Sequence, residues 1–370
     1  MFFAVGCCKD QWNLDGPNPS ITTLTFFSLN TVYILFLLYS SSYAVPFISH
    51  ETEINMGKEA DPQISERFGI YQDKTLQLYV NEIGQKLLGK LADKVFPRYF
   101  FKVVDSSDIN AFALPGGYVY VTRGLLAVLN SEAELAGVLG HEIGHITMHH
   151  GAKMMVRMIG AQILSIGGAI ASPKNSGNWI RLSTAMFQQI NNGYGREAEL
   201  QSDAQGLMNS FDSGYDPHDM VLFLKNLRRH EIMTGQAYHS FQATHPETKE
   251  RIIKANLIST SLLNRNKNVK SERNRYLSQL RGLPCGGKRH SEDSRNRDKP
   301  KYIDIYEIRE GDTLESIAVK ELGEKRHALE IAVLNGIKEM APLNKDDLLK
   351  IVKPGKFTRT QTLHIQPDPS

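Results

Sequence analysis

The clearest chemical pattern in this chain is the segment His141-Glu142-Ile143-Gly144-His145. Residues four apart on an α-helix lie one turn above each other on the same face. Two imidazoles at this spacing can bind one Zn²⁺, and the glutamate after the first histidine then stands beside the ion as a base for its water. The segment therefore predicts a zinc hydrolase, most simply a peptidase, with His141 and His145 as ligands and Glu142 as the base.

The surrounding sequence must place these side chains on a helix. Residues 132–141 are strong helix formers with apolar residues at core-like spacing, and Ser131 followed by Glu134 predicts an N-terminal capping box. We expect this helix to run to about Met158. Its three glycines, at 137, 140 and 144, each cost about 1 kcal/mol of helix stability relative to alanine, which favours a closely packed neighbour. The alternative is an ordinary helix with two surface histidines.

A catalytic zinc takes three protein ligands and one water, so a third ligand must come from elsewhere. The longer motif H-E-x-x-H-x-x-G-x-x-H fails here because neither the glycine nor the last histidine is present. His149 and His150 are near, but a solvated helix end explains both more simply. A second helical stretch places Glu199 and Asp203 on one face, where Glu199 can ligate zinc and Asp203 can hydrogen-bond a ligand histidine. Spacing alone favours a solvated helix face for these two carboxylates.

Several segments between about 57 and 258 together resemble metallopeptidase family forty-eight, a group of gluzincin proteases that includes HtpX and BepA-type periplasmic enzymes. In order they are Asn110–Leu126, Glu134-Leu-Ala with the H-E-x-x-H helix, Glu199-x-x-x-Asp203, Gly214-Tyr-Asp-Pro217 and His245–Arg251. The resemblance implies that His141, His145 and Glu199 bind one Zn²⁺ per chain, with Glu142 as general base and Asp203 as hydrogen-bond partner of a ligand. It also implies that His245 approaches the metal, to assist the transition state or to block the open site, with Arg251 close by.

The expected fold class is α+β, with a mostly helical zincin-type metalloprotease domain over residues 52–262 that contains a small sheet. We expect helices over 52–94, 180–191, 197–210, 217–230 and 247–258, and strands over 99–104 and 117–122. The strand at 117–122 fits a core strand and a substrate-pairing edge strand equally well. The apolar stretch 159–171 is too short to span a bilayer and fits a buried helix or an active-site flap, followed by a loop at 173–178.

The C-terminal part of the chain has a different composition. Residues 264–301 contain twelve lysines and arginines against four acidic residues, so we expect a basic flexible linker over 263–301, in which 276–282 could dock on the protease domain. Residues 302–354 follow the order strand, helix, helix, strand and resemble a LysM domain. This second resemblance implies binding to peptidoglycan or another N-acetylglucosamine polymer, and 355–370 form a tail.

The N-terminal segment predicts export. No charged residue lies between Asp15 and Glu51, and an apolar run at 31–39 is followed by small residues up to Ala44. This pattern predicts a secretory signal peptide over 1–44, with a retained membrane anchor as the alternative. Export and the bacterial branch of the family imply a periplasmic location, and an anchor would keep the protein near a membrane.

Together these features predict an exported zinc endopeptidase that degrades misfolded or unassembled envelope proteins and is tethered to the cell wall by its LysM-like module. Its expected partners are polypeptide substrates and the glycan. A net charge of +3 and the lack of any recognisable motif exclude nucleic acid as an expected partner. One alternative is a non-catalytic cell-wall adaptor or chaperone with a dormant zinc site, although the intact Glu142 favours the enzyme. Another is an amidase that cuts peptidoglycan.

Overall fold

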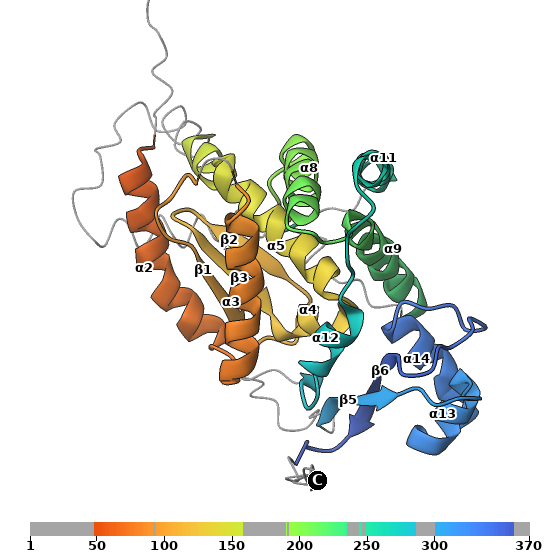
Figure 1. Cartoon of the computed structure of the whole chain (residues 1–370). Helices are drawn as coiled ribbons and strands as arrows, with labels where there is room; N and C mark the ends of the chain where they lie inside the picture. The colour runs from red at the N-terminus through yellow and green to blue at the C-terminus, as the bar shows by residue number, and fades with distance from the viewer. Residues whose placement is uncertain are drawn as a thin grey trace, which may run out of the picture. The chain divides into compact units, whose positions relative to one another are not determined.

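The computed structural model describes residues 48–91, 94–157, 190, 192–234, 244–245, 249–285 and 300–358, all within one unit that begins at Ile48 (Figure 1). The signal peptide or anchor predicted for 1–44, the flap at 159–171 and the loop at 173–178 lie outside the described residues, as does most of the predicted helix 180–191. Among the described residues, no helix is both long enough and apolar enough to cross a bilayer.

A three-stranded sheet forms the base of the predicted protease domain. Its strands are β1 (Phe100–Val104), β2 (Ala111–Leu114) and β3 (Tyr118–Thr122), in the spatial order β1-β3-β2. The central strand β3 runs parallel to β1 and antiparallel to β2. The segment 117–122 is therefore a core strand, and its alternative interpretation as a substrate-pairing edge is wrong. The edge strand next to the helices of the site is β2.

Each face of this sheet is covered by helices, because alternate residues of a strand point to opposite sides. One face packs against α3 (Lys74–Leu88) and α5 (Glu132–Thr147) in the main core, and the other packs against α2 (His50–Phe68). The single helix predicted over 52–94 is thus two helices. Gly69, at φ 74°, ends α2, and the side chain of Asp73 accepts hydrogen bonds from the first backbone N–H groups of α3.

The helix that carries His141 and His145, α5, is shorter than predicted. It ends at Thr147 instead of continuing to Met158, and residues 150–157 form a separate helical segment. Between them His149 adopts a left-handed φ of 54°, which is uncommon for a residue other than glycine. Its Nδ1 lies 2.7 Å from Glu53 Oε1 on α2, so a tertiary contact holds the chain in this turn. The structure also describes α4 (Arg123–Val128), α8 (Arg196–Asp212), α9 (Pro217–Thr234) and α11 (Lys249–Arg265) in this part of the chain.

The segment 263–301 is not a solvated linker where the structure describes it. Helix α11 continues to Arg265, and α12 (Arg273–Ser278) and the short strand β4 (Pro284–Cys285) follow. The apolar residues of this segment are fully or almost fully buried in the main core: Tyr276, Leu277, Leu280 and Leu283. These residues recur at helical spacing within a basic composition, so the net charge of the segment does not reveal that it packs on the protease domain. The prediction that 276–282 could dock there is confirmed.

Residues 300–358 contain the predicted order of elements. Strand β5 (Lys301–Glu307) is followed by α13 (Leu314–Leu322), a 3₁₀ turn (Lys325–His327), α14 (Ala328–Leu334) and β6 (Leu348–Pro354), and β5 pairs antiparallel with β6. This C-terminal module is joined to the peptidase part by buried contacts. The Nζ of Lys350, which is 0% exposed, donates to the backbone oxygens of Ala127 and Leu129 at 2.8 and 2.7 Å, and Ile303 belongs to the main core.

Candidate active site and metal centre

The site is built where α5 and α8 cross at very close range. A Cβ added to Gly140 would lie 3.0 Å from Gly206 Cα, and one added to Gly206 would lie 2.7 Å from the backbone nitrogen of His141. A Cβ added to Gly144 would lie 3.1 Å from Ser202 Cα. The glycines of α5 therefore serve the close helix packing that their presence predicts. The crossing sets the carboxylates of α8 directly opposite the histidines of α5.

Two imidazoles and one carboxylate converge at this crossing. The Nε2 atoms of His141 and His145 are 3.0 Å apart. The two oxygens of Glu199 lie 3.4 Å from His141 Nε2 and 3.5 Å from His145 Nε2. All three residues are at most 2% exposed. Three predicted ligands from two helices thus face one small region from which solvent is largely excluded.

His245 lies in the same cluster. Its Nδ1 is 3.2 Å from His141 Nε2 and 3.1 Å from Glu199 Oε2, and its Nε2 is 3.3 Å from Glu142 Oε1. Its Nε2 is also 3.3 Å from the backbone oxygen of Ala111 on the edge strand β2. The ligand atoms of His141, His145, Glu199 and His245 all lie within 4.8 Å of one another. The histidine that sequence alone would have placed in an ordinary turn is therefore a fourth donor at the centre.

A buried ion pair orients the first histidine. The Nδ1 of His141 lies 2.9 Å from Asp203 Oδ1, and Arg251 donates to the two oxygens of Asp203 at 2.7 and 2.8 Å. The Nη1 of Arg251 is also 3.0 Å from Glu199 Oε2. With Asp203 accepting from Nδ1–H, the neutral form of His141 has its lone pair on Nε2, which faces the centre and can bind a metal ion in exchange for a proton. Burial opposes the charged form of Asp203, but Arg251 outweighs it and lowers the pKa of this carboxyl.

His150 orients the second ligand histidine, His145, as Asp203 orients His141. Its Nδ1 lies 3.0 Å from His145 Nδ1, and its Nε2 lies 3.2 Å from Gln201 Oε1. If Gln201 accepts from His150 Nε2–H, then His150 Nδ1 accepts from His145 Nδ1–H, and His145 Nε2 is free to bind a metal. The sequence interpretation of His150 as a solvated helix end is wrong, because the break at His149 turns the chain back towards α8.

The electrostatics of the cluster favour a cation. Burial alone would lower the pKa of His141, but its contacts with Asp203 and Glu199 outweigh burial and raise that pKa to about 9. Burial alone would raise the pKa of Glu199, but its contacts with His245 and His141 outweigh burial and hold that pKa well below its ordinary value. The buried carboxylates therefore stay ionised and attract positive charge to the point where the imidazoles meet.

Glu142 is placed differently from the other acids. It is 0% exposed, and among the described residues neither carboxylate oxygen has a hydrogen-bond partner of acceptable geometry. Burial raises its pKa. A buried acid without a partner is costly unless something polar meets it, and a water held by a metal at the neighbouring donors would do so. The two imidazoles, the carboxylate and this unpartnered base fit a catalytic metal ion.

A comparison with known protein families agrees with this geometry. The model of Peptidase family M48 matches residues 74–258, which is half of the chain. The chain belongs to Peptidase family M48. The resemblance to metallopeptidase family forty-eight is thereby confirmed.

The chain is also similar to curated proteases. It is 33% identical over 190 residues to the "Putative beta-barrel assembly-enhancing protease" of Vibrio cholerae, which covers 50% of this chain and 39% of that protein. It is 29% identical over 244 residues to the "Beta-barrel assembly-enhancing protease" of Escherichia coli, and this match covers 62% of this chain and 48% of that protein. The "Mitochondrial metalloendopeptidase OMA1" of Arabidopsis thaliana is 29% identical over 164 residues, and this match covers 44% of this chain and 32% of that protein. The matched part spans less than half the length of each of these relatives.

Proposed function

We propose that this protein is an exported zinc-dependent endopeptidase that hydrolyses misfolded or unassembled envelope proteins. The observation that carries the proposal is the convergence of His141, His145 and Glu199 beside Glu142, a buried carboxylate whose oxygens have no hydrogen-bond partner among the described residues. Membership of a peptidase family supports the reaction class.

Zinc suits this donor set because two histidines and one carboxylate are a common set of protein ligands in catalytic zinc sites. His141, His145 and Glu199 would hold the ion. When bound, the ion supplies Lewis-acid chemistry, since it lowers the pKa of a coordinated water and polarises a carbonyl. Asp203 and His150 hold the two ligand imidazoles in the tautomers that this requires.

The protein's own residues account for the proton transfers. Glu142 takes a proton from the attacking water and returns it to the leaving amine nitrogen. His245 stands 3.3 Å from Glu142 and also contacts Glu199 and His141, so it fills the side of the cluster that a substrate carbonyl must approach. It therefore has to move, or to donate from its present position, when a peptide binds.

The substrate class is inferred from two features. Edge strand β2 lies beside the cluster, and an extended, unfolded polypeptide can add to such an edge through main-chain hydrogen bonds. Two of the relatives carry names that refer to assembly of β-barrels. Residues 302–354, read as a LysM-like module, would tether the enzyme to peptidoglycan in the periplasm.

Purified protein incubated with casein or with an unfolded outer-membrane β-barrel protein tests the proposal. We expect cleavage that a chelator abolishes and that zinc restores, with one zinc bound per chain. Glu142→Gln should bind zinc normally and cleave nothing, whereas Glu197→Gln, an exposed acid on α8, should behave as wild type.

Two results would contradict the proposal. Cleavage that continues in Glu142→Gln would remove the assigned base. A zinc-loaded wild type that cleaves no polypeptide would instead favour the adaptor or chaperone with a dormant site, and release of muropeptides from peptidoglycan would favour the amidase. Retention on purified peptidoglycan, compared with the same protein on cellulose, tests the tether separately.

A further inference from the structure

A second group of metal-binding side chains lies where the start of α2 meets the break after α5. His50 and Glu53 stand three residues apart on one face of α2, and His149 occupies the break. In the part of the chain that the structure describes, they form the one group of histidine, cysteine or acidic side chains, besides the catalytic cluster, in which three donor atoms lie within 4.8 Å of one another. Two imidazoles and a carboxylate are also the donor types that converge at the catalytic centre.

Glu53 is a buried carboxylate that lacks a basic partner. The residue is 2% exposed, and its Oε1 lies 2.7 Å from His149 Nδ1. Among the described residues, no lysine or arginine nitrogen lies within 4.0 Å of its carboxylate. A buried carboxylate stays ionised only where positive charge is close. A metal ion held together with His149 supplies that charge, whereas an acid at a solvated surface needs none.

The surroundings close one side of this group and leave the other open. The two imidazole rings lie nearly parallel, at 13°, with 5.2 Å between their centroids. Both pack against the ring of Phe96, which is 1% exposed, with centroid distances of 5.7 Å to His50 and 6.1 Å to His149. This apolar wall strengthens the attraction between Glu53 and a cation because it excludes water. His50 itself is exposed, so an ion can enter from solvent beside it.

The backbone at His149 is held in a conformation that serves this contact. Its left-handed φ of 54° is costly for a residue other than glycine, and such conformations persist where the surrounding structure requires them. Donor atoms around a tetrahedral ion lie about 3.3 Å apart. The pair formed by His149 Nδ1 and Glu53 Oε1 would therefore open by roughly half an ångström, while the exposed His50 side chain turns inward. Only side-chain movements are needed.

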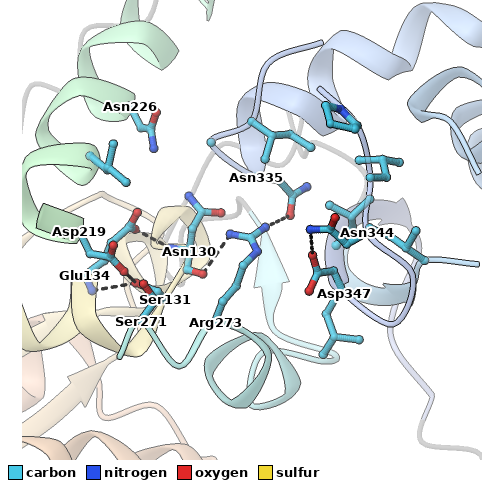
Figure 2. A pocket seen from close by; sticks show the side chains of 18 residues that line it. Asn130, Ser131, Glu134, Asp219, Asn226, Ser271, Arg273, Asn335, Asn344 and Asp347 are labelled. Carbon is cyan, nitrogen blue, oxygen red and sulfur yellow. Dashed lines mark hydrogen bonds between the residues drawn. The ribbon is translucent and has the colours of Figure 1, made fainter. Parts of the chain in front are cut away.

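The polar pocket between the C-terminal module and the peptidase part does not gather metal-binding side chains in this way (Figure 2). Its carboxyl groups each accept a hydrogen bond from the protein, at 2.6 Å for Glu134, 2.6 Å for Asp219 and 3.0 Å for Asp347. Its guanidinium, that of Arg273, donates to two oxygens of the wall. These groups are paired with their neighbours and, among the described residues, do not converge on one point.

We propose that His50, Glu53 and His149 form a second site for a divalent transition metal ion such as Zn²⁺, additional to the one ion per chain at the catalytic centre. The second site is the weaker of the two, because His50 has to be ordered on binding and the positive charge of Lys153 acts on His149. Its ion links α2 to the break after α5. His150, which orients a catalytic ligand, follows His149 directly, so this ion reinforces the turn that places His150.

Equilibrium dialysis of the full chain against increasing Zn²⁺, with bound metal measured by atomic emission, tests the proposal. We expect one ion per wild-type chain when zinc is limiting and two when zinc is in excess. His50→Ala should weaken the second binding step by more than about tenfold, because loss of even a hydrogen-bond partner behind a ligand has about that effect. His327→Ala is the matched control and should bind two ions, since His327 lies 3.0 Å from Glu330 but has no third donor beside it among the described residues.

Thermal unfolding gives a second measurement. Once the catalytic centre is filled, further zinc should raise the Tm of wild type and of His327→Ala but not of His50→Ala, because an ion that binds only the folded state stabilises it. Glu199→Ala, which lacks a ligand of the catalytic centre, should keep the second ion, and the double variant Glu199→Ala/His50→Ala should lose it.

The proposal is overturned if wild type binds a single ion at every zinc concentration, or if His50→Ala binds a second ion as tightly as His327→Ala does. A failure of the catalytic assignment has a different signature. Glu199→Ala would then bind as many ions as wild type, while the loss caused by His50→Ala would remain and would still support the second site.

Discussion

Replacing Arg251 by methionine should destabilise the protein far more than replacing an exposed arginine. Arg251 is 2% exposed and contacts Asp203 at 2.7 and 2.8 Å, Glu199 at 3.0 Å and the backbone oxygen of His245 at 3.1 Å. Without it, two ionised carboxylates remain buried with less compensation. Removing one partner of a buried pair in this way costs about 3–5 kcal/mol.

Arg196→Met is the matched control. The Arg196 side chain is 71% exposed and pairs with Glu250 at 2.6 Å, and an exposed pair of this kind contributes little to stability because water screens it. Urea unfolding followed by circular dichroism, in the presence of a chelator, measures both variants without compensation by a bound cation. We expect the free energy of unfolding to fall by several kcal/mol in Arg251→Met and to change little in the control.

Equal losses in the two variants would refute the reasoning, because burial would then make no difference to the ion pair. If Arg251→Met does not fold, Arg251→Lys replaces it, with Arg196→Lys as control. Lysine keeps the charge but loses the fork that bonds both oxygens of Asp203, so an intermediate loss is expected. Zinc should restore part of the lost stability, since a bound cation compensates the same carboxylates.

Three further predictions follow from the site and its surroundings. His150→Phe should weaken zinc binding about 10–100-fold in a chelator competition assay, because His145 loses the partner that fixes its tautomer; unchanged affinity would contradict that role. His245→Ala should lower KM for casein more than it lowers kcat if this side chain blocks the site, whereas a fall in kcat at constant KM would assign it to transition-state stabilisation. Burial raises the pKa of Glu53 to about 7, against the opposing charge of His50, so the folded state holds its proton more tightly than the unfolded state. The resulting contribution to the free energy of unfolding is complete below about pH 4.5 and is lost as pH rises through 7. Glu53→Gln should therefore reduce the pH dependence of stability measured by urea unfolding. An identical pH dependence in both proteins would show that Glu53 does not titrate in this way.

The sequence was most informative about α5 and its surroundings. The N-cap at Ser131, the helix and the close approach at its glycines follow from local chemistry, and the structure places them as expected. The predicted capping box forms only in part, because the carboxylate of Glu134 accepts from the backbone N–H of Asn130 and not from that of Ser131. Glu199 and Asp203 share one helix face, as predicted. Their spacing alone could not identify a metal site, because the same spacing occurs on any solvated helix face. Only the crossing of α5 and α8, a tertiary contact, makes it a site.

The errors share a physical cause. The break after Thr147 depends on the contact between His149 and Glu53, which are far apart in the chain, and it moves His150 from solvent to the back of His145. The docking of α12 depends on a few apolar residues whose effect is lost when charge is averaged over the whole segment. In both cases a distant partner overrides the local pattern.

The burial of Lys350 and Ile303 beneath the peptidase part has a consequence for the order of events during biosynthesis. The strand that carries Ile303 completes the main core, and the Nζ of Lys350 donates to backbone oxygens at the C-terminal end of α4, just before the helix that carries Glu142. A chain that has been synthesised only as far as Arg265, the end of α11, lacks both pieces. The peptidase part therefore cannot complete its core until the C-terminal module has been synthesised and has docked.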